Sequence, residues 1–362
     1  MDYRRRQERV LDELESRKLD ALLITHLPNV RYLCGFTGSS GVLLFTPSKT
    51  VFFTDGRYTQ QANAEVRGIR VSVGRKAALT SAAVWLAPHH PRGGKVILGV
   101  EGEHLTLAVR DNLACRLPAR VRLRGTFGIV EQHRLTKDAD EIAQIRRAVL
   151  LGARIFDRAL EKMRPGVSEV EIAAELEYAA RRNGAEGMSF PTIVAAGPRS
   201  ALPHARASAA RIPRHAPVLL DFGVILGGYC SDMTRTVFVG GASSMLRSVY
   251  GGVLEAQLAA VGAVGPGITP SEVDSAARAV LRRARLARFF THSSGHGVGL
   301  EIHELPRVAA GQKEPLSPGM VITIEPGVYV RGKGGVRIED MVVVTERGCE
   351  VLTPCSKELM VL

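Results

Sequence analysis

The chain has 362 residues, a hydrophobic fraction of 45% and a formal net charge of +12. That length accommodates two domains with separate cores, and no apolar run approaches the roughly 20 residues that cross a bilayer. The charged N-terminus lacks the apolar stretch of a secretory signal, and the five cysteines are odd in number and lack zinc-site spacing. We therefore expect a cytoplasmic protein with reduced thiols. The basic residues form short clusters without interleaved aromatic side chains, which indicates solvated helix faces and no nucleic-acid or membrane partner.

The first part of the chain alternates helical and strand-like patterns. Residues 4–18 predict an amphipathic helix, and residues 21–26 predict a buried strand. The apolar runs GVLLFT and TVFFTD predict a hairpin, because a Pro-Ser turn separates them, and KVILGVEG predicts a further strand. We therefore predict a mixed α/β domain over residues 1–132, without clustered metal ligands.

A polar stretch, EQHRLTKDADE, leads into a long helical pattern and into a second domain that we place at residues 133–362. Two segments of this domain resemble each other. Ser168 with Glu171, and Thr269 with Glu272, each form a capping-box pattern after a Pro-Gly turn. Each predicted helix is followed by strands that carry two acids. We therefore predict a duplicated helix–strand unit with a pseudo-two-fold axis, and an α+β fold for the whole chain.

The acid pairs are Asp221 with Asp232, and Glu325 with Glu339. Asp221 follows the apolar run VLL, Glu325 ends the β-branched run VITI, and Glu339 precedes MVVV. Four acids buried together repel one another unless cations neutralise them. Two divalent metals would balance the four carboxylates, so the sequence predicts a two-metal site.

Histidines and an arginine extend this set. His296 lies among glycines that leave room for close approach, and it adds one nitrogen to the oxygen ligands. Such a set suits Mn²⁺ or Co²⁺, with Zn²⁺ as a further option. Arg337 lies two residues before Glu339, so on one strand the two share a face and Arg337 reaches a neighbouring carboxylate. His204 and His303 are candidates to donate hydrogen bonds to a developing oxyanion.

Two metals roughly 3.5–4 Å apart share a water molecule and hold it as hydroxide. Such a hydroxide attacks a carbonyl or a phosphoryl group. The ligand set alone therefore leaves an amidase and a phosphoesterase as alternatives.

The chain resembles the proline-specific metallopeptidases with the pita-bread fold, which include Xaa-Pro aminopeptidases and Xaa-Pro dipeptidases (prolidases). The segments that carry this resemblance are FPTIVAAGPRSALPHARAS, VLLDFGVILGGYCSDMTRTVFVG, HSSGHGVGLEIHE, VITIEPGVYV and GGVRIEDMVVV, in this order. LPNVRYLCGFTGSSGVLLF and VFFTDGRYTQQA are similar to the N-terminal domain of creatinase-like proteins. The resemblance implies a creatinase-like domain followed by a pita-bread catalytic domain.

By position, the resemblance implies that Asp221 binds one metal. Asp232 and Glu339 would bridge both metals, and His296 with Glu325 would hold the second. The family hydrolyses the bond between an N-terminal residue and a proline at position two, by attack of a hydroxide that bridges the metals.

The resemblance also implies roles around the metals. His204 and His303 match histidines that bind substrate, and Arg337 matches an arginine behind the ligands. Glu325 would carry the proton to the leaving proline nitrogen. The family further implies a homodimer or tetramer in which the N-terminal domain helps to close the active site, and we predict the homodimer.

The substrate length stays open at this point. The segment TDGRYTQQA favours an Xaa-Pro aminopeptidase, and SALPHARAS and HSSGHGVGLEIHE resemble prolidase equally well. We therefore predict an Xaa-Pro aminopeptidase, with an Xaa-Pro dipeptidase as the alternative. A metal-free binding scaffold is a distant alternative, which the complete ligand set disfavours.

Overall fold

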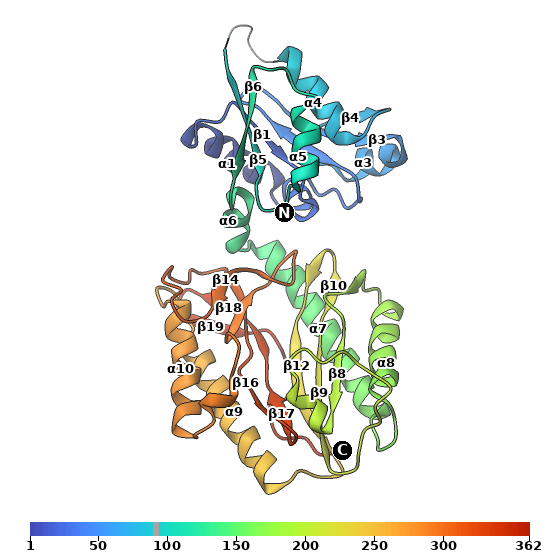
Figure 1. The fold of residues 1–362 in the computed structure, drawn as a ribbon, viewed down its shortest axis with the longest axis vertical. Coiled ribbons are helices and arrows are strands. Elements are labelled where there is room, and N and C mark those ends of the chain that lie inside the picture. The colour runs from blue at the N-terminus through green and yellow to red at the C-terminus, as the bar shows by residue number, and fades with distance from the viewer. Residues whose placement is uncertain (90–93) are drawn as a thin grey trace. The chain divides into compact units, whose positions relative to one another are not determined.

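The computed structural model describes residues 1–89 and 94–362, drawn as ribbons in Figure 1. Its contacts divide the chain into two compact units, an N-terminal unit of residues 1–134 and a C-terminal unit of residues 135–362. No helix among the described residues is long and apolar enough to cross a membrane.

The N-terminal unit is an α/β layer structure. In chain order its elements are α1 (Tyr3–Ser16), β1 (Ala21–Ile24), α2 (Leu27–Cys34), β2 (Val42–Phe45), β3 (Thr50–Asp55), η1 (Gly56–Tyr58), α3 (Thr59–Glu65), β4 (Arg70–Gly74), α4 (Ala78–His89), β5 (Val96–Glu101), α5 (Leu107–Ala114), β6 (Val121–Thr126) and α6 (Ile129–Leu135). The strands form one sheet in the order β4-β3-β2-β1-β5-β6. The predicted hairpin is confirmed, because β2 and β3 pair antiparallel. Strand β1 is buried throughout, so its run of apolar residues forms the middle of this core.

The C-terminal unit contains the remaining elements. They are α7 (Ala139–Lys162), α8 (Glu169–Arg182), β7 (Gly187–Met188), β8 (Ile193–Ala196), η2 (Gly197–Ala201), β9 (Ala216–Phe222), β10 (Val224–Leu226), β11 (Tyr229–Cys230), β12 (Met233–Val239), α9 (Ser244–Ala263), α10 (Pro270–Arg283), η3 (Ala287–Phe289), β13 (Gly295–Gly297), β14 (Glu304–Val308), β15 (Val321–Ile324), β16 (Gly327–Val330), β17 (Gly334–Arg337), β18 (Asp340–Thr345) and β19 (Gly348–Val351).

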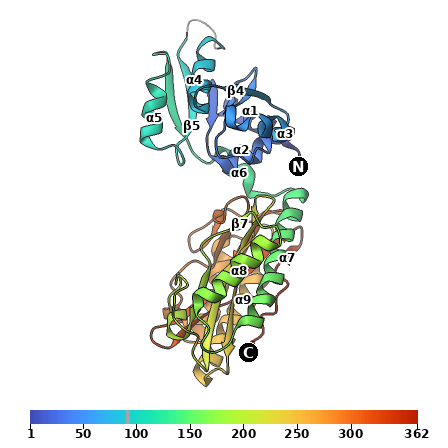
Figure 2. The same ribbon diagram turned by 90° about the vertical axis from the view of Figure 1, so that its right-hand side faces the viewer.

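Two helix–sheet halves make up this unit. Helices α7 and α8 form one core with β9 and β12, and α9 and α10 form another with β15 and β18. Figure 1 shows α9 and α10 on the left of this unit and α8 on its right, and Figure 2, turned by 90°, shows α8 in front with α7 along the right-hand edge. This arrangement matches the predicted duplication, since each half contributes two helices and its own sheet.

The helix starts of the two halves are built alike. Ser168 accepts a hydrogen bond from the Glu171 amide while the Glu171 side chain returns to the Ser168 amide, and this capping box begins α8. Thr269 and Glu272 form the same reciprocal pair at the start of α10. Both capping boxes were predicted from the sequence and are confirmed. Each satisfies two amide groups that the first helical turn would otherwise leave without partners.

One local prediction is wrong. Arg337 and Glu339 do not lie on one strand, because β17 ends at Arg337 and β18 begins only at Asp340. Between these strands the Ile338 amide bonds to a carbonyl of the β15–β16 turn, and the Glu339 amide donates to the Thr234 carbonyl of β12 at 3.1 Å. The chain therefore passes from the β16–β17 hairpin to the larger sheet at this point, and Glu339 faces β12.

Candidate metal centre

The four predicted acids and His296 come from five separate segments of the C-terminal unit and meet between its halves. Asp221 lies in β9, Asp232 in the link between β11 and β12, Glu325 directly after β15, and Glu339 between β17 and β18. His296 is the middle residue of β13. Ligand atoms of Asp232, His296 and Glu339 all lie within 4.8 Å of one another. The structure thus brings together residues that are more than a hundred positions apart.

A tight turn places the two aspartates. Strands β10 and β11 pair as a hairpin with Leu226 opposite Tyr229, which leaves Gly227 and Gly228 as the two turn residues. Both have positive φ, 59° and 82°, as the mirror-image turn of a two-residue hairpin requires. The chain then returns alongside β9 as β12. Asp232 therefore enters the site from the start of β12, close to Asp221.

Glycines position His296. A Cβ atom at Gly295 would lie 1.9 Å from the Thr323 carbonyl oxygen, and one at Gly297 would lie 2.1 Å from that of Leu305. Both positions therefore require glycine, as the sequence predicted. The Nδ1 atom of His296 lies 3.0 Å from the Gly297 carbonyl oxygen, which orients the ring.

The other ring nitrogen of His296 faces the acids. Its Nε2 atom lies 3.6 Å from Oδ2 of Asp232 and 3.7 Å from Oε1 of Glu325. These separations are too long for hydrogen bonds, but they suit ligands that share an ion. Burial lowers the pKa of His296 to about 4. The imidazole is therefore neutral at pH 7, the form that binds metals.

The carboxylates are held at high electrostatic cost. Burial, followed by the charges of neighbouring acids, raises the pKa of Asp232 and of Glu339 well above the ordinary range. Burial also raises the pKa of Glu325 to about 8, against the opposing charge of Arg337. The buried Oδ1 atoms of Asp221 and Asp232 accept no hydrogen bond in the described structure. Buried oxygens with unused lone pairs fit divalent cations, which neutralise the charge and occupy those lone pairs.

Arg337 contacts one member of this cluster directly. Its Nη2 group donates to Asp221, and its Nη1 group donates to the hydroxyl of Tyr329. Its Nε group donates to Thr234 Oγ1 at 3.1 Å, and that hydroxyl in turn donates to Oε2 of Glu339 at 2.6 Å. One guanidinium cannot balance four carboxylates, so it orients them and leaves most of their charge uncompensated.

The two predicted substrate histidines lie at the edge of the cluster. His303 is exposed in the loop before β14, with its ring centroid 4.5 Å from that of His296. Burial and then the nearby charge of His204 lower the pKa of His303. His204 is itself exposed, in the loop after η2. Both side chains are therefore open to a ligand beside the acids.

Sequence reasoning missed His292 and Tyr329. The Nε2 atom of His292 lies 2.9 Å from the Tyr329 hydroxyl, which links it to Arg337. Burial lowers the pKa of His292 to about 4. The sequence did contain one indication of His292, since it lies four residues before His296 in the same glycine-rich segment. Tyr329 carried no such signal.

Comparison with known proteins places this site in a family. Residues 143–346, more than half of the chain, match the model of metallopeptidase family M24. The chain belongs to that family. Residues 6–136 match the creatinase/prolidase N-terminal domain. The M24 assignment confirms the predicted pita-bread architecture and the prediction of a peptidase, and it implies the use of a divalent metal.

Relatives of this M24 chain cover nearly its whole length. An Xaa-Pro dipeptidase of Pyrococcus horikoshii is 36% identical over 358 residues, which are 98% of each chain. The structure of an Xaa-Pro dipeptidase from Bacillus anthracis aligns with a TM-score of 0.94 at 38% identity and covers 100% of both chains. That of an X-Pro aminopeptidase from Thermotoga maritima aligns with a TM-score of 0.87 at 36% identity and covers 96% of this chain and 99% of that one.

Proposed function

We propose that this chain is an Xaa-Pro dipeptidase with two divalent metal ions. The observation that carries the proposal is the end-to-end similarity to Xaa-Pro dipeptidases at 36% and 38% identity. The aminopeptidase predicted from the sequence is less well supported than the dipeptidase, which was the alternative. The segment TDGRYTQQA therefore did not discriminate between the two.

The metals would be held by the five residues of the acidic cluster, Asp221, Asp232, His296, Glu325 and Glu339. The unpartnered oxygens of Asp221 and Asp232 support this assignment. So does the close approach of ligand atoms from Asp232, His296 and Glu339. Mn²⁺ or Co²⁺ suits the oxygen-rich set, with Zn²⁺ as the further option. Divalent ions at such a site polarise a carbonyl group and activate water at neutral pH.

The residues around the metals would handle protons and charge. Glu325, which lies directly after β15 beside the other acids, would carry a proton to the nitrogen of the leaving proline. His204 and His303 would donate hydrogen bonds to the carbonyl oxygen as negative charge develops on it. Arg337 holds the carboxylate of Asp221 in place.

An arginine beside the site supports the preference for a dipeptide. Arg307 of β14 lies directly opposite His296 of β13 in the antiparallel ladder. Opposite residues of such a pair project from the same face of the sheet, so Arg307 lies on the face that carries the ligand His296. Arg307 is exposed. A dipeptide carries a free carboxylate on its proline, and a guanidinium binds that group well.

The test compares Ala-Pro with Ala-Pro-Ala-Ala after the chelator-treated protein has been reloaded with Mn²⁺ or Co²⁺. We expect cleavage of Ala-Pro to dominate. Efficient release of alanine from the tetrapeptide with little cleavage of Ala-Pro would overturn the proposal in favour of the aminopeptidase, which the similarity to the Thermotoga maritima structure supports.

A variant of Arg307 tests whether this residue binds the carboxylate of the dipeptide. Arg307→Gln removes the charge, and we expect KM for Ala-Pro to rise roughly ten- to a hundredfold, the worth of one hydrogen bond between charged groups. The value for Ala-Pro-amide, which lacks the carboxylate, should change little. Arg347→Gln, at an exposed position in the β18–β19 turn, is the matched control. An equal effect on both substrates would contradict the role of Arg307.

The homodimer and the cytoplasmic location remain predictions. The five cysteines of the chain are all free thiols, which is compatible with a reducing compartment. Light scattering of the purified protein tests the dimer, with a mass twice that of the chain as the expected result.

A further inference from the structure

Residues 352–362 bind the strand that follows the ligand Glu339. The Leu352 amide donates to the Met341 carbonyl at 2.8 Å, and the Met341 amide donates to Thr353 Oγ1 at 3.0 Å. Further along, the Phe238 amide of β12 donates to the Met360 carbonyl at 2.9 Å. This segment therefore contacts both β18 and β12, the two strands that begin beside metal ligands.

A buried carboxylate ties the same segment to the residue after Glu339. Lys357 Nζ lies 2.7 Å from Oδ2 of Asp340, and Gln257 Nε2 lies 2.9 Å from the same oxygen. Asp340 Oδ1 accepts from Nη2 of Arg235 at 2.7 Å. Asp340 is fully buried and Arg235 is 2% exposed. Charges removed from water to this extent persist only with complete sets of partners.

Arg235 connects this network to Glu339. Its Nη1 group donates to the Glu339 carbonyl oxygen and to the Thr234 carbonyl oxygen, the latter at 2.9 Å. The Thr234 carbonyl also accepts from the Glu339 amide. Glu339 lies between two strands, so its main chain gains little support from regular strand pairing. Its peptide groups are bonded instead to Thr234 and Arg235.

Residues 352–362 hold the opposite side of the Arg235 guanidinium. Arg235 Nε donates to the Ser356 carbonyl at 2.9 Å, and Nη2 donates to the Cys355 carbonyl at 2.7 Å. A planar guanidinium has donors in fixed directions. Its position against the Glu339 carbonyl is therefore determined by the carbonyl groups of residues 355 and 356.

We propose that Arg235 is a positioning residue for the metal ligand Glu339, and that residues 352–362 are a structural part of the metal centre. The segment holds Arg235 and Asp340, and these two residues hold the main chain of Glu339, whose carboxylate reaches the metals. Loss of this support lets the carboxylate move, and a displaced ligand binds metal more weakly. The inference rests on the ligand role of Glu339 in the proposed function.

The test measures metal affinity directly, by competition of Mn²⁺ or Co²⁺ between the full chain and a chromogenic chelator. Arg235→Lys keeps the charge beside Asp340 but cannot reach all five acceptors, and we expect at least about a tenfold loss of affinity. Lys357→Met leaves Asp340 paired with Arg235 and Gln257, and we expect a loss of a few-fold.

The control separates positioning from general loss of stability. Leu281→Ala creates a cavity in α10, where Leu281 is fully buried, and lowers the unfolding temperature without touching the network. We expect wild-type metal affinity in this variant. The unfolding temperature of each metal-free protein is recorded alongside, so that affinities are compared between variants of similar stability.

The outcomes are distinguishable. Wild-type affinity in Arg235→Lys and Lys357→Met, or an equal loss of affinity in Leu281→Ala, would overturn the positioning role and leave the proposed function intact. If Arg235→Lys does not fold, Lys357→Met decides by itself. Absence of metal binding by the wild-type protein would overturn both proposals.

Discussion

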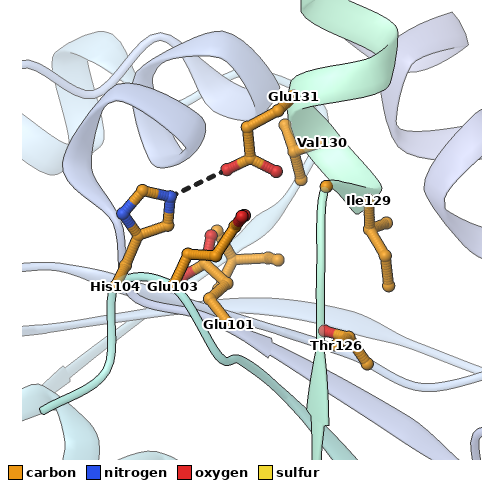
Figure 3. A pocket seen from close by; sticks show the side chains of 9 residues that line it. Glu101, Glu103, His104, Thr126, Ile129, Val130 and Glu131 are labelled. Atoms are coloured by element: carbon orange, nitrogen blue, oxygen red, sulfur yellow. Dashed lines mark hydrogen bonds and ion pairs between the residues drawn. The ribbon is translucent and has the colours of Figure 1, made fainter.

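Two acidic clusters in this chain differ in how their carboxylates are satisfied, and the difference separates a structural cluster from the candidate metal centre. In the N-terminal unit, Glu101 accepts hydrogen bonds from Asn29 on one oxygen, and from the amides of Thr25 and His26 on the other. Glu131 accepts from Asn29 and lies 3.0 Å from Nε2 of His104 (Figure 3). Burial disfavours the charge of Glu131, but these bonds outweigh it and lower its pKa.

In the C-terminal unit the effect of burial on the carboxylate pKa values exceeds that of the hydrogen bonds. Burial and mutual repulsion raise the pKa of Asp232 and of Glu339, and an oxygen of Asp232 accepts no hydrogen bond in the described structure. Both clusters contain several acids and at least one histidine. The number of acids therefore does not distinguish the two clusters, whereas buried carboxylate oxygens without donors mark the C-terminal one as the candidate metal site.

The sharpest test of this contrast is Asp232→Asn. We expect the metal content to fall below the wild-type value and kcat/KM to fall by more than about a hundredfold, which exceeds the typical cost of losing a supporting partner. The metal-free variant should unfold at a higher temperature than the metal-free wild type, because one of the repelling acids is gone. Metal analysis, Ala-Pro hydrolysis and thermal unfolding measure these effects.

The control for that variant is Glu350→Gln, which removes an acid from an exposed ion pair with Arg146. It should change none of the three measurements appreciably. Normal metal content and turnover in Asp232→Asn would contradict the assignment of the cluster.

The metal-free protein should lose stability as the pH rises from about 6.5 to 8. The pKa of Glu325 is raised to about 8, so the folded state holds a proton that the unfolded chain has released. The stabilisation that such a group contributes is fully present below its pKa in the unfolded chain. It is lost as the pH rises through its pKa in the folded state. His296, with its pKa lowered to about 4, acts in the opposite direction only below about 6.5. Between about pH 6.5 and 8, the titration of the buried carboxylates therefore determines how the stability changes.

Denaturant unfolding in the presence of a chelator measures this slope, which reaches about 1.4 kcal/mol per pH unit for each extra proton bound. Saturating Mn²⁺ should flatten it, because bound metal keeps the carboxylates ionised. If the stability of the metal-free protein stays constant or rises between about pH 6.5 and 8, the proposed repulsion among the buried carboxylates is contradicted.

The smallest effect is expected in the N-terminal cluster. Glu131→Gln replaces an ionised acceptor of Asn29 and His104, and should cost about 1–2 kcal/mol of unfolding free energy. Metal content should not change, because this cluster is satisfied by protein donors alone. Glu103→Gln, in the lining of the same pocket, is the control and should cost less. Loss of bound metal in Glu131→Gln would show that the N-terminal cluster also holds an ion.

Several local features of the site were predicted from the sequence because each depends on residues close together in the chain. The turn at Gly227–Gly228, the glycines around His296 and the two capping boxes each depend on residues within a few positions. Tyr329 was missed because its partners, His292 and Arg337, become neighbours only when β16 and β17 pair beside the loop before β13. The strand predicted through Arg337 and Glu339 failed for a related reason, since Glu339 bonds to β12 instead.

The sequence by itself predicted the candidate ligands, which are two pairs of acids beside apolar runs and a histidine among glycines, and it predicted two helix starts with the same capping pattern. Only the tertiary structure decided how these residues are held. The bonds that orient them join positions about a hundred residues apart, such as Thr234 with Glu339 and Arg337 with Asp221. Local spacing predicts the direction of a side chain on its own strand. It carries no information on which distant strand supplies the donor, because that depends on how the two halves pack.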